Sequence, residues 1–180
     1  LDAIKLVRNK MGLKNLHVMI PFVRTISQLK DIKQIMYQHG LKRTSNFKLF
    51  MMAEIPSNVL MLDKFIDVGI DGVSIGSNDL TMLMLGVDRD NEMVADIYDI
   101  HDPSALKALE MIVTTCKKRK ILCSICGQAP SIYPDITRML VKWGATSVSV
   151  SPDMIDQTRI VVYQSEEYVK KHPERHPKKK

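Results

Sequence analysis

Short apolar runs alternate with longer amphipathic stretches along this chain. The apolar runs are rich in β-branched residues and lie at 16–23, 48–55, 72–76, 121–125 and 147–150. Runs of this length that are apolar on both faces are typical of buried parallel strands. The amphipathic stretches between them predict helices at 26–38, 58–68, 103–119 and about 134–143.

Capping residues support the starts of three of these helices. Thr25 and Ser57 precede the first two as predicted N-caps, and Asp102 followed by Pro103 opens the third. Strands that alternate with helices predict an α/β fold with a parallel sheet, either a (β/α) barrel or a doubly wound sheet. No unit carries a glycine-rich nucleotide-binding loop, which disfavours the doubly wound nucleotide-binding fold.

The basic charge of the chain is concentrated at its end. The net charge is +6, and residues 170–180 carry six basic residues against one Glu, so the remainder is nearly neutral. We therefore predict one domain over residues 1–163 and a basic, disordered, solubilising tail over 164–180. Nucleic-acid binding through this tail is disfavoured, because the body is not basic and the tail has no interleaved aromatic residues.

Composition also limits the location of the protein. No apolar run is long enough for a membrane span, and residues 1–12 do not resemble a signal peptide. The cysteine count is three, an odd number, which favours free thiols in a reducing cytoplasm over a disulfide framework.

Polar residues follow three of the predicted strands, at the point where each strand ends. They are Glu54, the run Ser77, Asn78 and Asp79, and Cys126. Because the carboxyl ends of parallel strands meet at one rim, we expect these side chains to converge. Two carboxylates with water and a substrate oxygen are the ligands that Mg²⁺ prefers, so the pattern indicates a Mg²⁺ and acid/base site.

Each of these residues also has a purely structural interpretation. Glu54 and Asp79 are acids that suit a helix N-terminus, and Gly76-Ser77-Asn78 suits an ordinary turn. Cys126 in a strand is often a buried filler residue. With Cys123 it forms Cys-x-x-Cys, but zinc is disfavoured because no second pair or histidine couple has the required spacing.

Five motifs occur in the order MIPFVRT, MAEIPSNV, SIGSNDLT, LGVDRD and ICGQ. With these motifs residues 3–158 resemble the C-terminal barrel of the phosphoenolpyruvate (PEP)-utilising enzymes, and the PEP synthase branch (pyruvate, water dikinases) more than the pyruvate, phosphate dikinases. The resemblance implies a partial (β/α)8 TIM-type barrel with about the last five β/α units.

The resemblance also implies a function for the residues at the strand ends. Glu54 and Asp79 would hold Mg²⁺ and, with Gly76, Ser77 and Asn78, bind pyruvate or PEP. Cys126 would be the acid/base at the methyl carbon of pyruvate. The full enzymes convert ATP, pyruvate and water to AMP, PEP and phosphate.

Departures from the family pattern qualify this expectation. Met82 stands where the family commonly has Gln, and Ala129 stands in place of a glycine-containing loop. The family's phosphate-gripping arginines come from earlier strands, and Arg24 is the candidate that this chain offers. The resemblance therefore implies that the chain needs the N-terminal phosphohistidine and ATP-binding domains, in cis or in trans, and is not competent alone. A non-catalytic remnant or assembly module of the same fold is the alternative, and open sheet edges predict a homo-oligomer.

Overall fold

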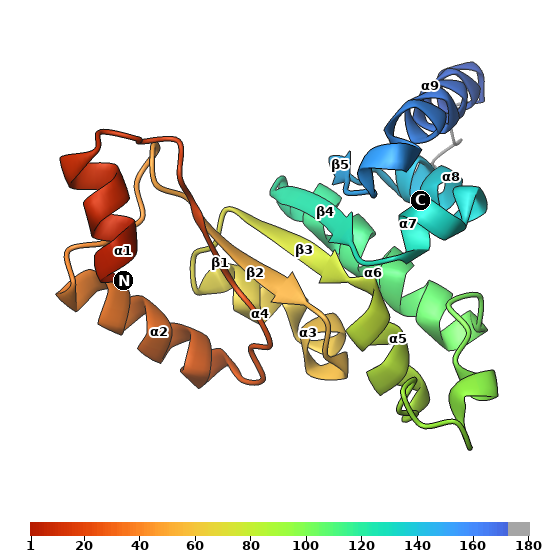
Figure 1. Cartoon of the computed structure of the whole chain (residues 1–180), viewed down its shortest axis with the longest axis horizontal. Helices are drawn as coiled ribbons and strands as arrows, with labels where there is room; N and C mark the ends of the chain where they lie inside the picture. Colours follow the sequence, from red (N-terminus) through yellow and green to blue (C-terminus); the bar gives the residue numbers. More distant parts are fainter. Residues whose placement is uncertain (173–180) are drawn as a thin grey trace, which may run out of the picture.

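A computed structural model describes residues 1–172 and shows a five-stranded parallel sheet with the strand order β1-β2-β3-β4-β5 (Figure 1). The strands are β1 (Val18–Ile20), β2 (Leu49–Ala53), β3 (Gly72–Gly76), β4 (Leu122–Cys126) and β5 (Ser147–Val148). All four pairings are parallel. Each predicted apolar run therefore coincides with one strand, although β4 extends one residue beyond its run to Cys126, and the α/β class is confirmed.

Helices connect successive strands along the whole sheet, and one more helix, α9, follows the last strand. They are α2 (Ile26–Gln38), α3 (Pro56–Leu60), α4 (Leu62–Asp67), α5 (Ser77–Leu85), α6 (Pro103–Arg119), α7 (Ala129–Ile132), α8 (Pro134–Trp143) and α9 (Ile155–Lys171). A short helix α1 (Asp2–Lys5) continues as the π-helical turn η1 (Leu6–Lys10), and η2 (Ala95–Ile97) and η3 (Pro152–Met154) are 3-10 turns. Within the described residues no helix is both long and apolar enough to cross a membrane.

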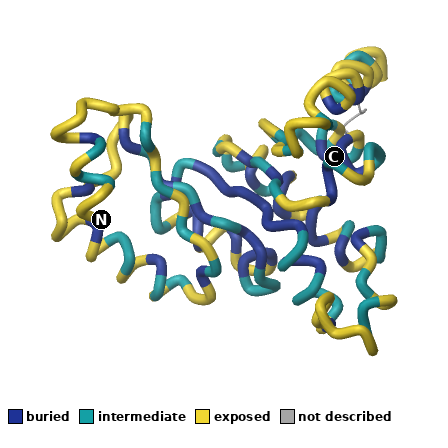
Figure 2. The backbone as a smooth tube through the Cα atoms, viewed as in Figure 1, coloured by how far each residue is buried: buried dark blue, intermediate teal, exposed yellow. Residues whose placement is uncertain are grey.

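One face of the sheet forms the core with the helices. The register aligns Met51 with Val73 and Cys123, and all three side chains are buried. Helix α6 packs against β3 and β4 through buried residues such as Ile112. Fully burying an aliphatic side chain of this size stabilises a fold by about 1.5–3 kcal/mol. In Figure 2 the buried residues follow the sheet, whereas α9 is mostly exposed.

The opposite face of the sheet is only partly covered. Met19 on β1 and Leu122 on β4 are 43% and 42% exposed. In a closed barrel this face would be filled by side chains from all the strands. An open sheet of consecutive parallel β/α units with one helix-covered face is therefore consistent with a partial TIM-type barrel.

Three of the predicted helices match their bounds, in α2, α6 and α8, and the predicted caps of α2 and α6 are present. Thr25 accepts a hydrogen bond from the backbone N–H of Gln28, and Asp102 accepts one from that of Ser104. The predicted helix 58–68 is wrong in detail. It is divided at Met61 into α3 and α4, and Ser57 does not cap it.

The predicted disordered tail began too early. Residues 164–171 belong to α9, which packs on α8 with Val161 and Ser165 buried. The sequence pattern did not indicate the end of this helix, because its buried residues lie before residue 166 and the charged residues follow them. Residues 173–180 of the predicted tail lie outside the described residues.

Candidate functional site

The predicted polar residues lie at the carboxyl ends of the three central strands. Glu54 directly follows β2, Cys126 ends β4, and Gly76 at the end of β3 is in register with Cys126. Ser77, Asn78 and Asp79 form the first turn of α5, with Gly76 as its N-cap residue. The chain therefore brings these residues to one rim of the sheet, but Gly76-Ser77-Asn78 opens a helix rather than forming an isolated turn.

Glu54 is almost completely buried, with 2% of its surface exposed. Its Oε1 accepts a hydrogen bond of 2.7 Å from the backbone N–H of Phe22. Burial raises the pKa of the Glu54 carboxyl, the Phe22 N–H opposes this, and the nearby charge of Asp79 raises it further. The fold therefore holds a carboxylate where its negative charge is unfavourable unless a cation is bound.

Gly76 leaves room for this carboxylate. A Cβ atom at position 76 would overlap Glu54 Oε2 and lie 3.0 Å from Glu54 Cβ. The backbone of Gly76 has a φ of −82°, which any residue can adopt. Close approach of the carboxylate, rather than backbone conformation, is thus what requires glycine here.

Asn58 holds the backbone of Glu54 in place, and the sequence pattern did not single out this residue. Asn58 is fully buried in α3, where its Nδ2 donates a 2.8 Å hydrogen bond to the carbonyl of Val23. Its Oδ1 accepts from the backbone N–H groups of Glu54 and Ile55, at 3.3 and 3.2 Å. One amide thus joins the end of β2 to the loop after β1. The signal was the motif PSNV, in which Asn58 follows the predicted strand by only a few residues.

The loop after β1 reaches the rim in a strained conformation. Phe22 has a φ of 53°, in the left-handed region that residues other than glycine rarely adopt. This conformation places its N–H against Glu54 Oε1. The guanidinium of Arg24 lies 5.0 Å from the centre of the Phe22 ring, on an exposed side chain. Strain of this kind is typical of residues held in place at functional sites.

The start of α5 is joined to the loop after β4. Ser77 is fully buried and donates a 2.8 Å hydrogen bond to the carbonyl of Cys126. Asn78 Oδ1 accepts from the backbone N–H of Gln128 at 3.2 Å. Gly127 has a φ of 100°, and a Cβ atom there would overlap Ser77 Oγ. The Ser77 hydroxyl therefore fixes the rim, whereas Asn78 Nδ2 donates no hydrogen bond within residues 1–172.

Cys126 is a free, half-buried thiol on the open face of the sheet. Its Sγ lies 3.5 Å from the carbonyl oxygen of Ile75 and 3.6 Å from Ser74 Oγ. Cys123 faces the helices instead, where a hydrogen bond with Cys116 and burial raise the pKa of its thiol. Three residues apart on a strand, the two thiols point to opposite faces and do not form a shared zinc site.

Tyr98 also reaches the rim, from the long connection between α5 and α6. Its hydroxyl lies 3.4 Å from the carbonyl oxygen of Asn78, to which it donates. Burial raises the pKa of Tyr98, hydrogen bonding by Thr81 and the charge of Arg89 oppose this, and Asp79 adds to the increase. Long connections that follow strand ends commonly shape binding pockets, but the length of this connection does not single out Tyr98.

The carboxylates fit a hard cation with few protein ligands. Within residues 1–172 no group of three or more His, Cys, Asp or Glu side chains is arranged to hold a metal ion. In the same part of the chain no Lys or Arg forms an ion pair with Glu54 or Asp79. Mg²⁺ is commonly bound by one or two carboxylates together with water and substrate oxygens. A buried carboxylate repelled by a second one matches that type of site.

Comparison with known proteins identifies the family. The PEP-utilising enzyme, PEP-binding domain family matches residues 1–167. This chain belongs to the PEP-utilising enzymes. The matched range contains every residue of the rim, and the predicted resemblance is confirmed.

Curated relatives within the family are named PEP synthases. The chain is 44% identical to PEP synthase of Helicobacter pylori over 172 residues, which is 95% of this chain and 21% of that protein. It is 49% identical to a probable PEP synthase of Staphylothermus marinus over 89% of this chain and 19% of that protein. It is 44% identical to PEP synthase of Escherichia coli over 87% of this chain and 20% of that protein. The chain thus spans about a fifth of the length of these relatives.

Proposed function

We propose that this chain forms the pyruvate- and PEP-binding half-site of a PEP synthase-like phosphotransferase. The observation that carries the proposal is the buried Glu54 carboxylate, whose pKa is raised by burial and by Asp79. Glu54 and Asp79 would hold Mg²⁺, which supplies positive charge to a developing enolate oxygen. The family membership of the chain and the names of its relatives support this substrate class.

The remaining residues of the rim have separate roles in this proposal. Asn78 Nδ2 would donate to a substrate oxygen, while Gly76 gives the space for the Glu54 carboxylate. Cys126 would take a proton from the methyl carbon of pyruvate, or in the reverse direction return one to the methylene carbon of the enolate, as a general acid/base. Ser77 would act on the substrate indirectly, by holding Cys126 and α5 together.

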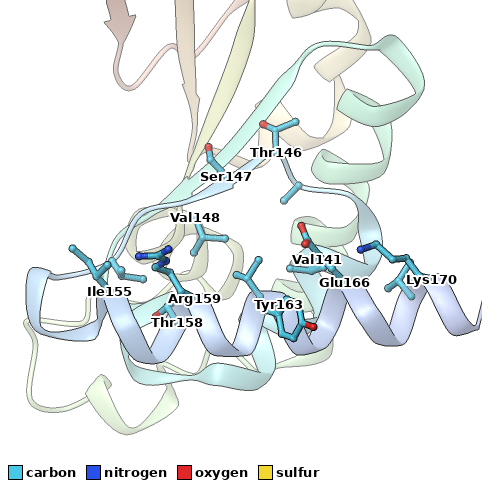
Figure 3. Close-up of a pocket in the computed structure, with 14 residues that line it drawn as sticks. Val141, Thr146, Ser147, Val148, Ile155, Thr158, Arg159, Tyr163, Glu166 and Lys170 are labelled. Carbon is cyan, nitrogen blue, oxygen red and sulfur yellow. The ribbon is translucent and has the colours of Figure 1, made fainter.

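The full reaction, from ATP, pyruvate and water to AMP, PEP and phosphate, would require further polypeptide in cis or in trans. The half-covered sheet supports this, because Met19 and Leu122 are exposed on the face that a barrel encloses. A groove of about 710 Å³ between β5 and α9 also lies beside the open edge of the sheet (Figure 3). Val148 and Ile155 contribute to its apolar lining. Missing β/α units would cover both surfaces.

Self-association of the isolated chain is part of the same proposal. Both β1 and β5 are edge strands in the described residues, and open edges favour pairing with another chain. Light scattering should therefore give a mass above that of the 20.5 kDa monomer at high concentration. A monomeric mass under these conditions would contradict this part of the proposal.

Calorimetric titration with oxalate, a mimic of enolpyruvate, tests the half-site. We expect binding to need Mg²⁺, to be lost in Asp79→Ala and to persist in Asp96→Ala, a control at an exposed aspartate of the long connection. Cys126→Ala should retain binding, since the thiol acts on a proton rather than on the metal. Failure of the folded wild-type chain to bind oxalate with Mg²⁺ would refute the proposal and favour an assembly module.

A further inference from the structure

A basic pocket lies at the opposite end of the sheet from the rim. It has a volume of about 530 Å³ and is formed by one face of α2, the connection from α2 to β2, and the end of α4. A strand of five residues is about 17 Å long at about 3.3 Å per residue, so this pocket is well separated from the strand ends that carry Glu54 and Cys126. Pockets of about 300–1,000 Å³ are typical of small-molecule sites.

The floor of the pocket is apolar and its border is basic. Buried side chains of the core form the floor, namely Met36, Leu41, Phe47 and Leu49. Lys30, Lys33, Lys42 and Arg43 contribute the cationic groups. Lys30, Lys33 and Tyr37 share one face of α2, because residues three and four apart on a helix are neighbours.

The acidic residues of this region are already paired. Arg43 makes two 2.8 Å hydrogen bonds to the carboxylate of Asp71. Asp67, which lines the pocket, accepts a 2.7 Å hydrogen bond from Arg119. Positive charge therefore remains on the lysines of the border, which take part in no ion pair within residues 1–172.

Lys33 is the most constrained of these lysines. Its Nζ donates to the carbonyl groups of Val68 and Gly69 at the end of α4. Lys33 Nζ and Arg43 Nη1 both lie within 3.5 Å of the position that a Cβ atom would take at Gly69. Burial and the charge of Arg43 lower the pKa of Lys33, and Asp71 opposes this. An anion placed between these groups would relieve their repulsion.

We propose that this pocket binds an organic phosphate, with the phosphate at the lysines and an apolar ring or chain on the floor. Lys42 already lies over the ring of Tyr37 at 5.7 Å from its centre, so a cationic and an aromatic group meet at the mouth. A phosphate alone would leave the floor unused, and an uncharged aromatic compound would leave the lysines unpaired. Because the pocket lies away from the rim, its ligand would not be the pyruvate or PEP of the proposed function.

The test uses 1-naphthyl phosphate as the probe, on the full chain without Mg²⁺, followed by its own fluorescence. We expect one saturable site, with inorganic phosphate and 1-naphthol each at least tenfold weaker. Added salt should weaken binding, because exposed charges are screened. Equal binding of inorganic phosphate would overturn the proposal, since the apolar floor would then contribute nothing.

Variants locate the site. Lys30→Gln with Lys42→Gln should weaken 1-naphthyl phosphate binding at least tenfold, and both positions are exposed, so the fold should be kept. Lys10→Gln with Lys118→Gln removes the same charge elsewhere and should change binding less than twofold. Binding that is absent from the wild type, unaffected by the first pair, or lost in Asp79→Ala would overturn the proposal. In the last case the probe would occupy the rim instead.

Discussion

Replacement of Asn58 by Ala should remove the hydrogen bonds that join the end of β2 to the loop after β1. Asn58 is fully buried and makes three hydrogen bonds, to the carbonyl of Val23 and to the N–H groups of Glu54 and Ile55. Each net hydrogen bond contributes roughly 1 kcal/mol, and partners left buried without one cost more. We therefore expect Asn58→Ala to lower the free energy of unfolding by about 3 kcal/mol.

The size of this effect can be measured by chemical denaturation followed by circular dichroism. For a chain of this length a loss of about 3 kcal/mol corresponds to roughly 6–12 °C in Tm. Ser57→Ala is the matched control, because its hydroxyl makes one 2.9 Å hydrogen bond to the carbonyl of Arg24, and it should cost about 1 kcal/mol or less. A loss below about 1 kcal/mol for Asn58→Ala would refute the assigned role of this amide.

Three further predictions concern the same rim. Gly76→Ala should abolish Mg²⁺-dependent oxalate binding, because the new Cβ overlaps the Glu54 carboxylate; calorimetry should show that Gly86→Ala, where a Cβ meets nothing within 4 Å, retains it. The folded chain holds the Glu54 proton more tightly than the unfolded chain, so stability without Mg²⁺ should fall as pH rises above the ordinary pKa of 4.5. Glu54→Gln should therefore be more stable than wild type at pH 7 in urea denaturation, with the difference shrinking toward pH 4; equal stability at pH 7 would contradict the raised pKa. Iodoacetamide should label Cys126 alone in the native chain and all three cysteines in urea, as counted by mass spectrometry; native labelling that persists in Cys126→Ser would contradict the assigned burial of the other two.

The strands and the rim were predictable because each depends on local pattern. An apolar run that ends in a polar residue places that residue at a strand end, and parallel pairing brings such ends together. The first turn of α5 was not predictable in this way, because Ser77 and Asn78 suit a turn equally well. In the structure both side chains contact the loop around Gly127, which is distant in the sequence, and a local pattern does not indicate such contacts.

Contacts across the sequence also explain what else was missed. Tyr98 reaches Asn78 only because the connection after α5 returns to the start of that helix, and the residues around Tyr98 in the sequence do not indicate this return. Asn58 resembles any polar residue in the first turn of a helix until its three partners are known. The end of α9 was hidden because its basic residues outweigh, in composition, the few side chains that contact α8.

The position of the rim on the three central strands has a consequence for local unfolding. Edge strands open at lower free energy than the middle of a sheet, and β1 and β5 are the short edges here. Opening of β5 would leave Glu54, α5 and Cys126 in place. Opening of β1 would instead withdraw the N–H of Phe22 from Glu54. Opening of β1 therefore changes the surroundings of the Glu54 carboxylate, whereas opening of β5 does not.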